Sequence, residues 1–502
     1  MHPIEAGHPI NAGHPINAGH AVNAGVTGPA DPVPLCVDLD GTLIRSDLFV
    51  ESLFALLGKN VAYLFLIPVW LMRGKAHLKH QIAQRVDLDV TLLPYHGPFL
   101  NYLREQRAAG RRLVLVTATH QKYAREVAAY LGLFENMLAT DDRTNLSGTD
   151  KRARLTADYG AHGYDYAGNS RKDLKVWSEA RRAVVVAPDR GVKAGAERLA
   201  TLERSFDEDK GRVKEYLRAV RPHQWIKNLL VFVPLIASHK VHDLALLLDA
   251  ALAFSSFSLC AASVYLLNDL LDLEADRHHP RKRRRPFAAG RISVVRGSLL
   301  IPVTLILAFA LALMTLPPAF GAALGVYYLM TVAYSLRLKR VLMLDVVVLA
   351  GLYSIRIVAG TLAIAETHSF WLLAFSMFIF LSLAMAKRCA ELSAMQSLAE
   401  DPVKGRGYRR SDLEMVQSLG ASSGQIAVLV LALYIVQDGG YEAYSRPEVL
   451  WLLCPLLLYW IGRVWIFAHR GWLHEDPVVF ALRDRMSWWI GASALAIIWL
   501  SI

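Results

Sequence analysis

Residues 263–293 read SVYLLNDLLDLEADRHHPRKRRRPFAAGRIS. An apolar run ends at Leu267, and the polar residues Asn268, Asp269, Asp272 and Asp276 follow it at spacings of one, three and four. On a helix, side chains at these spacings share one face over about two turns. Carboxylates at the end of a membrane helix are costly unless they bind cations. The stretch therefore predicts a helix that ends in a cation-binding acidic cluster.

The chain around this stretch has the composition of a membrane protein. Of its 502 residues, 54% are hydrophobic and 20% are charged, whereas soluble domains carry about 25% charged residues. The apolar residues after position 220 fall into runs long enough to cross a bilayer. We predict nine membrane spans, at 226–240, 245–267, 297–315, 317–335, 342–363, 369–386, 418–437, 448–467 and 486–502.

The basic residues alternate between the loops that connect these spans. The loops after the second, fourth, sixth and eighth spans are rich in Arg and Lys, and the loops between them are nearly free of basic residues. Under the positive-inside rule the basic loops are cytoplasmic, which puts the N-terminal region in the cytoplasm and the C-terminus outside. The net charge of +11 is then explained by topology and phosphate ligands, and we expect no nucleic-acid partner.

The N-terminal 220 residues have the pattern of a soluble α/β domain. Residues 34–45 read PLCVDLDGTLIR, a short apolar strand that ends in Asp38-Leu39-Asp40-Gly41. Two carboxylates two positions apart at a strand end lean the same way, and Gly41 permits a sharp turn after them. Such a pair suits Mg²⁺, and a neutralised carboxylate can act as a nucleophile on phosphorus.

This segment resembles the first motif of the haloacid dehalogenase (HAD) phosphatase superfamily, and three further segments match in order. They are RRLVLVTAT (111–119), GTDKRARL (148–155) and YAGNSRKDLKVW (166–177). The resemblance implies a parallel Rossmann-like sheet with helices on both faces. It makes Asp38 the nucleophile, Asp40 the general acid/base, and Thr117 and Lys151 the phosphate ligands. The implied Mg²⁺ ligands are Asp38, Asp40, Asn169 and Asp173. The family usually has Asp where this chain has Asn169, which offers Mg²⁺ an oxygen but no charge.

The Asp-rich stretch NDxxDxxxD resembles the first motif of the UbiA superfamily of intramembrane prenyltransferases, whose fold has nine helices. Typical aromatic prenyltransferases carry a second cluster of Asp residues after the fourth span. Residues 333–360 of this chain read AYSLRLKRVLMLDVVVLAGLYSIRIVAG instead, in which Asp345 is the one acidic residue. The segments RPHQWIKNLLVF (221–232), LSLAMAKRCAEL (381–392) and GRGYRRSDL (405–413) are similar to those of the branch that makes polyprenyl-phosphate phosphoribose.

That resemblance implies transfer of 5-phosphoribose from phosphoribosyl pyrophosphate to a polyprenyl phosphate, with the N-terminal domain removing the 5-phosphate to leave polyprenyl-phosphate ribose for cell-envelope synthesis. Asp269 and Asp272 would be catalytic and would hold Mg²⁺ together with Asp276. The implied substrate ligands are Lys227, Asn268, Lys282, Arg285, Tyr334, Lys339, Asp345, Lys387 and Arg388. The alternative is an aromatic prenyltransferase with a non-catalytic HAD-like domain. The resemblance does not fix the chain length of the lipid or whether the protein forms a homo-oligomer.

The predicted organisation has four parts. A hexamer repeat (HPIEAG, HPINAG, HPINAG, HAVNAG) forms a tail at 1–33, and the HAD-like domain occupies 34–200 with a helical cap at about 46–95. Residues 201–216 are a charged connector, and 217–502 form the UbiA-type domain in a bacterial inner membrane. Leu53–Leu71 is unusually apolar, so we expect the cap helices to dip into the membrane surface.

Overall fold

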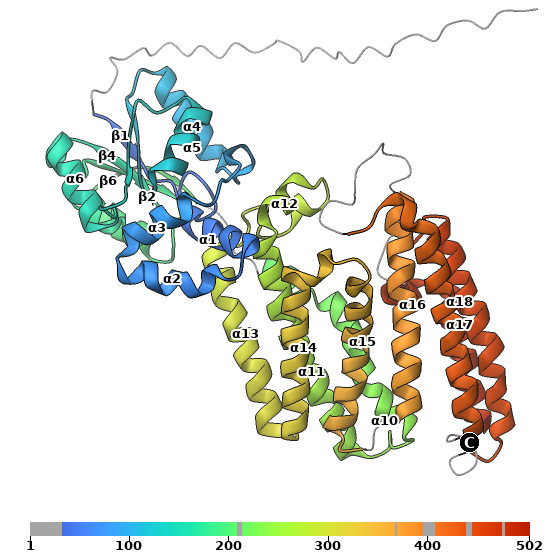
Figure 1. Cartoon of the computed structure of the whole chain (residues 1–502). Helices are drawn as coiled ribbons and strands as arrows, with labels where there is room; N and C mark the ends of the chain where they lie inside the picture. Colours follow the sequence, from blue (N-terminus) through green and yellow to red (C-terminus); the bar gives the residue numbers. More distant parts are fainter. Residues whose placement is uncertain are drawn as a thin grey trace, which may run out of the picture.

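The computed structural model describes residues 33–207, 213–366, 369–394, 407–437, 444–473 and 477–501. The chain folds into an α/β domain followed by a bundle of long helices (Figure 1). This arrangement confirms the predicted fold class. The predicted tail lies outside the described residues except for Val33.

The α/β domain is built on a parallel sheet in the order β3-β2-β1-β4-β5-β6. Its strands are β1 (Leu35–Val37), β2 (Leu113–His120), β3 (Asn136–Thr140), β4 (Asp165–Gly168), β5 (Arg182–Val186) and β6 (Thr201–Phe206). Strand order reverses direction beside β1, the strand that ends in Asp38. In such sheets the crevice at the carboxyl ends of the strands is where ligands bind.

Alternate strand residues pack into two separate cores because successive side chains point to opposite faces. Leu113 and Leu115 face one core with α4 (Gly97–Ala108) and α5 (Gln121–Leu131). Val114 and Val116 face the other, which is closed by α6 (Thr149–Tyr159), α7 (Leu174–Trp177) and α8 (Val192–Leu199). The sheet is thus covered on both sides, as predicted.

The cap lies between β1 and β2 and consists of α1 (Leu48–Lys59), α2 (Tyr63–Met72), α3 (Lys75–Ala83) and a 3-10 turn at Val90–Leu92. Helix α1 begins directly after the Asp40 loop because the Asp47 side chain accepts a hydrogen bond from the Val50 N–H, 3.0 Å away. The cap is therefore attached closely to the strand end that carries the acidic pair.

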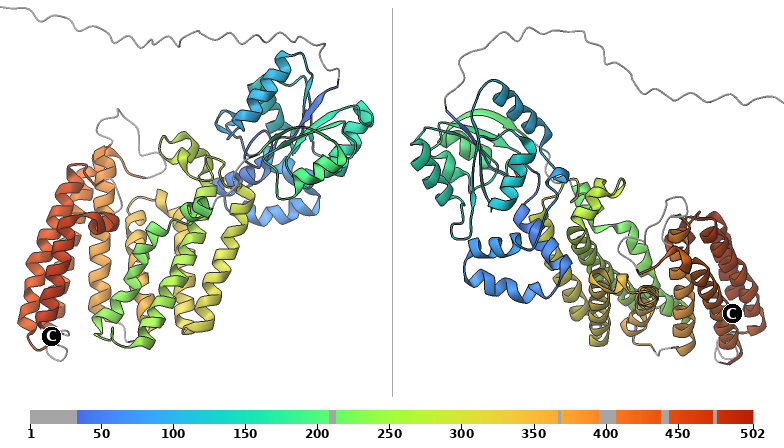
Figure 2. Two further views of the ribbon diagram at one scale, coloured as in Figure 1. Left: turned by 180° about the vertical axis from the view of Figure 1, so that it is seen from behind. Right: turned by 45° about the horizontal axis from the view of Figure 1, so that its top comes forward.

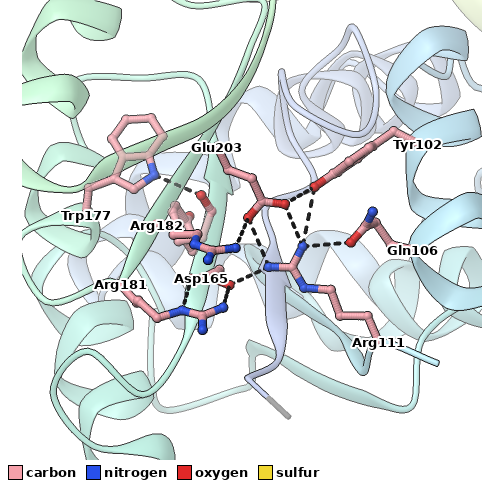
Figure 3. A network of polar contacts seen from close by, with 9 residues as sticks. Tyr102, Gln106, Arg111, Asp165, Trp177, Arg181, Arg182 and Glu203 are labelled. Atoms are coloured by element: carbon pink, nitrogen blue, oxygen red, sulfur yellow. Dashed lines mark hydrogen bonds and ion pairs between the residues drawn. The ribbon is translucent and has the colours of Figure 1, made fainter. Parts of the chain in front are cut away.

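The predicted connector is wrong over residues 201–206, which form the edge strand β6. Glu203 on this strand accepts hydrogen bonds from Tyr102 on α4 and from Arg111, whose Nη1 lies 2.8 Å from Oε1 (Figure 3). Arg111 also pairs with the buried Asp165 on β4. A charged sequence that looks like a solvated linker is held in the sheet by buried ion pairs, which a count of charges does not reveal.

The described C-terminal part is a bundle of long helices. They are α11 (Leu244–Leu271), α13 (Val294–Thr315), α14 (Pro318–Leu336), α15 (Leu344–Ala363), α16 (Phe370–Ala394), α17 (Leu413–Gln437), α18 (Leu453–His469) and α20 (Arg485–Ser501). Shorter elements are α9 (Val213–Val220), α10 (Val233–Ala237), α12 (Leu273–His278) and α19 (Pro477–Arg483), with 3-10 segments η2 (Pro222–Phe232), η3 (Lys282–Arg284), η4 (Leu338–Arg340), η6 (Arg410–Asp412) and η7 (Pro447–Leu452).

Seven helices of the described chain are long and apolar enough to cross a membrane, so the protein is a multi-pass membrane protein. The predicted count of nine is not confirmed. The first predicted span is instead η2 followed by the five residues of α10, and the last is the 17-residue α20. Because a 3-10 helix rises about 2.0 Å per residue, η2 and α10 together extend about 30 Å, close to the thickness of a hydrocarbon core.

Candidate active sites

The acidic pair of the α/β domain lies at the carboxyl end of β1, as predicted. Lys151 Nζ donates to Asp38 Oδ1 at 2.7 Å and to the Tyr166 hydroxyl at 3.0 Å. Tyr166 in turn donates to Asp173 Oδ1 at 2.8 Å. The structure thus brings together Asp38, Lys151 and Asp173 although they are distant in sequence. Tyr166 was not predicted; it belongs to the quoted fourth motif, and its role depends on the pairing of β1 with β4.

Asp40 is held by the start of the cap. The Leu48 N–H donates to Asp40 Oδ1 at 2.9 Å, and the Thr119 hydroxyl donates to Oδ2 at 2.5 Å. Thr117, the predicted phosphate ligand, is 3.5 Å from the same oxygen. Thr119 is a second hydroxyl that the sequence reasoning missed, and its spacing of two from Thr117 on one strand is the signal that could have found it.

Burial alters the acidity of this pair. It raises the pKa of Asp38 to about 6, although the Lys151 ammonium acts in the opposite direction. Burial and the nearby Asp47 carboxylate raise the pKa of Asp40 to about 7, against the hydrogen bonds from Leu48 and Thr119. A carboxyl that titrates near neutrality suits a general acid.

Asn169 lies against the turn that follows the acidic pair. A Cβ on Gly41, whose φ is +76°, would lie 2.3 Å from Asn169 Nδ2, so only glycine fits there. Asp173 accepts hydrogen bonds from the N–H groups of Asn169 (3.1 Å) and Ser170 (2.8 Å) and is held rigidly. The candidate metal ligands of this site are all oxygen donors, and the pKa values of the buried Asp38 and Asp40 are raised. Both features fit a divalent cation such as Mg²⁺.

The Asp-rich stretch is not the single helix that was predicted. Helix α11 ends at Leu271, Asp272 caps it, and α12 begins at Leu273. The Asp276 N–H still donates to the Asp272 carbonyl at 2.8 Å, so the chain turns only slightly. Asp269 and Asp276 remain close enough to share one partner, since Arg285 Nη1 lies 3.2 Å from Asp269 Oδ1 and 2.6 Å from Asp276 Oδ2.

Other cations surround the same carboxylates. Arg221 pairs with Asp269, and Lys339 Nζ lies 3.7 Å from Asp272 Oδ2. Arg221 was quoted within its motif without a role, and only the fold brings it to the acidic cluster. Lys282 is exposed on η3, and Asn268 is half-buried beside Asp269. Over the described chain, no group of three or more His, Cys, Asp or Glu side chains is placed to hold a metal ion together. The carboxylate oxygens here are of the type that Mg²⁺ prefers.

The predicted ligands on α14 to α16 form a second buried group. Asp345 is completely buried; the Tyr408 hydroxyl donates to its Oδ1 at 2.6 Å, and Arg388 Nε lies 2.8 Å from its Oδ2. Arg388 also reaches the Tyr334 hydroxyl at 3.5 Å. Lys387 is half-buried on α16, and Lys227 lies over the ring of Tyr353 at 5.8 Å. Asp345 is thus paired with an arginine, an arrangement that needs no metal.

Segments that adjoin the two acidic sites meet at the interface between the domains. A cavity of about 370 Å³ lies between the cap and the end of the helix bundle, and its walls include Glu51, Lys59, Asp272, His278, Lys339 and Arg340. A Cβ on Gly290, which follows the Arg cluster, would lie 2.7 Å from Arg45 Cβ, so the loop after Asp40 packs directly on the basic loop. Arg296 Nη2 also pairs with Asp189 Oδ1 at 3.1 Å. The carboxyl edge of the sheet is therefore turned toward the Asp-rich cluster.

Comparison with known protein families matches both parts of the chain. The UbiA prenyltransferase family model matches residues 229–491, and the haloacid dehalogenase-like hydrolase model matches residues 35–177. These matches confirm both resemblances that were read from the motifs.

Individual relatives cover either almost the whole chain or little more than half of it. The uncharacterized protein y4nM of Sinorhizobium fredii is 38% identical over 92% of this chain and 89% of its own length. Nodulation protein NoeC of Azorhizobium caulinodans is 35% identical over 54% of this chain and 88% of its own length. The decaprenyl-phosphate phosphoribosyltransferase of Mycobacterium tuberculosis is 31% identical over 57% of this chain and 91% of its own length.

Proposed function

This chain belongs to the UbiA prenyltransferase family and carries a haloacid dehalogenase-like domain, and from this we propose that it is a bifunctional enzyme of the membrane. Its helical domain transfers 5-phosphoribose from phosphoribosyl pyrophosphate to a polyprenyl phosphate and releases pyrophosphate. Its α/β domain then removes the 5-phosphate from the product. The sequence identity of 31% to a decaprenyl-phosphate phosphoribosyltransferase, over 91% of that relative's length, supports the first step.

The transfer would take place at the Asp-rich cluster. Asp269, Asp272 and Asp276 would hold Mg²⁺. Its positive charge would stabilise the negative charge that develops on the leaving pyrophosphate. Arg221, Arg285 and Lys339, which neutralise these carboxylates in the structure, are placed to bind the phosphate oxygens instead. An oxygen of the lipid phosphate forms a bond to the anomeric carbon as the bond from that carbon to pyrophosphate breaks. The attacking oxygen is already anionic, so no residue has to remove a proton.

The buried group on α14 to α16 would serve this step indirectly. Arg388 is held between Asp345 and Glu391, and Tyr334 is held by Arg388. We assign Asp345 to the orientation of Arg388, and Arg388, Tyr334, Lys387 and Lys227 to the phosphates and ribose of the substrates. In this assignment Asp345 needs no second aspartate beside it, because its partner is an arginine.

The dephosphorylation would take place at the α/β domain. The Asp38 carboxylate forms a bond to phosphorus, the ester bond to the ribose 5-oxygen breaks, and Asp40 gives that oxygen its proton. Water then hydrolyses the phosphoryl-Asp38 bond with Asp40 accepting the proton. Lys151 and Thr117 would bind the phosphate oxygens. The Mg²⁺ ion would be held by Asp38, Asp40, Asn169 and Asp173, and it would offset the negative charge of the phosphate.

One observation carries the proposal that both steps belong to one pathway, namely the packing of the Asp40 loop on the basic loop that follows the Asp-rich cluster. The transferred ribose would stay attached to the lipid, so a fused phosphatase at the same face acts at a raised effective concentration. Under the positive-inside rule both sites lie on the cytoplasmic side of a bacterial inner membrane.

The test is an assay of purified protein in lipid with labelled phosphoribosyl pyrophosphate and polyprenyl phosphate. The unchanged chain should give lipid-linked ribose, Asp38→Asn should accumulate lipid-linked phosphoribose, and Asp269→Asn should give neither. The same product from the unchanged chain and Asp38→Asn would refute the phosphatase step. Transfer of a prenyl group to an aromatic acid, with no ribosylation of the lipid, would support the aromatic prenyltransferase instead.

A further inference from the structure

Helix α2 of the cap is apolar on all sides. Its ten residues, YLFLIPVWLM, include no charged side chain. Tyr63, Ile67 and Trp70, spaced by four and three, form the inner face and pack against the core of the α/β domain. On a surface helix the opposite face is normally polar, and a helix that is hydrophobic all round is normally buried.

The outer face of α2 is not buried by any described part of the chain. Its exposed apolar residues are Leu64, Phe65, Leu66, Val69, Leu71 and Met72. Phe65 is 79% exposed and Met72 is 88% exposed, so these large side chains stand almost free of the protein. Contiguous exposed apolar patches of this kind mark a surface that something else covers.

The position of α2 indicates what covers it. Helix α1, which precedes it, packs on α11 and α13, and a Cβ on Gly58 would lie 3.8 Å from the Leu271 carbonyl oxygen. Both Figure 1 and Figure 2 show α2 on the side of the α/β domain nearest the helix bundle, beside the upper part of α13. Three outward side chains of α13 are about half exposed or more and belong to a candidate membrane span, namely Leu299, Val303 and Ile306. The outer face of α2 therefore continues the lipid-facing surface of α13.

The residues that flank α2 fit the same environment. Lys59 precedes the helix, Arg73 and Lys75 follow it, and all three are exposed. Basic residues at the ends of an apolar segment are favoured near anionic headgroups.

We propose that α2 lies in the interfacial layer of the bilayer beside α13, with Phe65 and Met72 among the acyl chains, so that the phosphatase cap is anchored to the membrane by a helix that does not span it. This inference concerns location and holds whether or not the proposed reactions are correct. A helix of this type sinks about 5–10 Å into the boundary between headgroups and acyl chains. It would keep the α/β active site at the level where a lipid-linked phosphate leaves the bilayer.

The test uses the full chain in liposomes of phosphatidylglycerol and phosphatidylethanolamine, with a polarity-sensitive fluorophore on Phe65→Cys. The four native cysteines are buried and should stay unlabelled. Tyr130→Cys is the matched control, since Tyr130 is a 51% exposed aromatic residue on α5 of the same domain. Labelling of Met72→Cys provides a second position if the first variant fails to fold.

We expect the label at 65 to emit at shorter wavelength than the label at 130. Lipids that carry a spin label near the headgroup should quench it more strongly than lipids labelled at the chain end, and aqueous iodide should quench it weakly. Equal quenching of both labels by iodide would overturn the proposal. Protection of the label at 65 from iodide without quenching by any spin-labelled lipid would also overturn it, in favour of a protein partner such as a second copy of the chain.

Discussion

Arg277, the residue after the last acid of the Asp-rich stretch, makes a two-pronged ion pair with Glu51 on the cap. Its Nη1 lies 2.8 Å from Oε2 and its Nη2 lies 2.6 Å from Oε1, and both side chains are more than nine-tenths buried. Glu51 also accepts a hydrogen bond from Ser46, in the loop after Asp40. One buried contact thus links the two candidate active sites.

Loss of one partner of this pair should weaken the domain interface. Arg277→Met leaves Glu51 charged and buried, which costs about 3–5 kcal/mol in comparable cases. Thermal unfolding of the purified chain and protease resistance of the interface measure the effect. The double variant Glu51→Gln with Arg277→Met should recover most of the loss, because no buried charge remains.

The exposed pair between Arg296 and Asp189 provides the matched control. Its side chains are 46% and 43% exposed, so Asp189→Asn should cost less than about 1 kcal/mol. Equal losses from Arg277→Met and Asp189→Asn would contradict the assignment of Arg277 and Glu51 as the main polar link between the domains.

Asn169→Asp should strengthen metal binding at the phosphatase site. The substitution adds a carboxylate beside Asp38 and Asp173 without changing the shape of the side chain that packs on Gly41. We expect the Mg²⁺ concentration for half-maximal phosphate release to fall about tenfold, equivalent to about 1.4 kcal/mol. Asn136→Asp, at an exposed position on β3, controls for the added charge. An unchanged Mg²⁺ requirement would argue that Asn169 does not contact the ion.

The α/β domain should lose stability in mild acid because of His120. Burial first, then the neighbouring His80 and Lys122, lower the pKa of His120 to about 4 from its ordinary value of about 6.5. The folded state therefore favours the neutral ring, and its stabilising effect is complete above pH about 6.5 and is lost as the pH falls toward 4. His120→Gln should flatten the pH dependence of the unfolding temperature over this window. The same slope in the variant and the unchanged chain would exclude His120 as its cause.

Substitution of Asp345 should lower the stability of the protein, whereas substitution of Asp272 should abolish ribosyl transfer. Asp345→Asn removes one of the two acidic partners of the buried Arg388 and leaves Glu391 as the other, so we expect a stability loss of about 1–3 kcal/mol. Asp272 is 44% exposed, so Asp272→Asn should leave the unfolding temperature nearly unchanged while abolishing ribosyl transfer. Unfolding in detergent and the transfer assay, run on both variants, separate the two roles. Normal stability with lost transfer in Asp345→Asn would make Asp345 a direct ligand.

The amino-acid sequence was sufficient for the features that depend on local pattern. The apolar runs after residue 220 identified a membrane domain. The hydrocarbon core of a bilayer excludes unpaired polar groups, and this holds however the helices pack on one another. The motif around Asp38 predicted the parallel sheet and its acidic edge. The spacing of Asp269 and Asp276 predicted that their side chains lie close together, and both pair with Arg285. Local pattern failed at residues 201–206, where charged side chains are paired across the sheet, and at Asp272, where the helix turns.

Only the tertiary structure decided which distant residues meet. Arg221 reaches Asp269 and Arg388 reaches Asp345 through helix packing, for which a single sequence contains no local signal. Likewise, the sequence shows that Leu53–Leu71 is apolar, but in the structure this segment is divided between two helices, α1 and α2. Helix α1 packs on the helix bundle, whereas α2 keeps an outer face that the described protein does not cover. The reason is physical: periodicity reports that an apolar face must be covered, and only the folded chain shows what lies beside it.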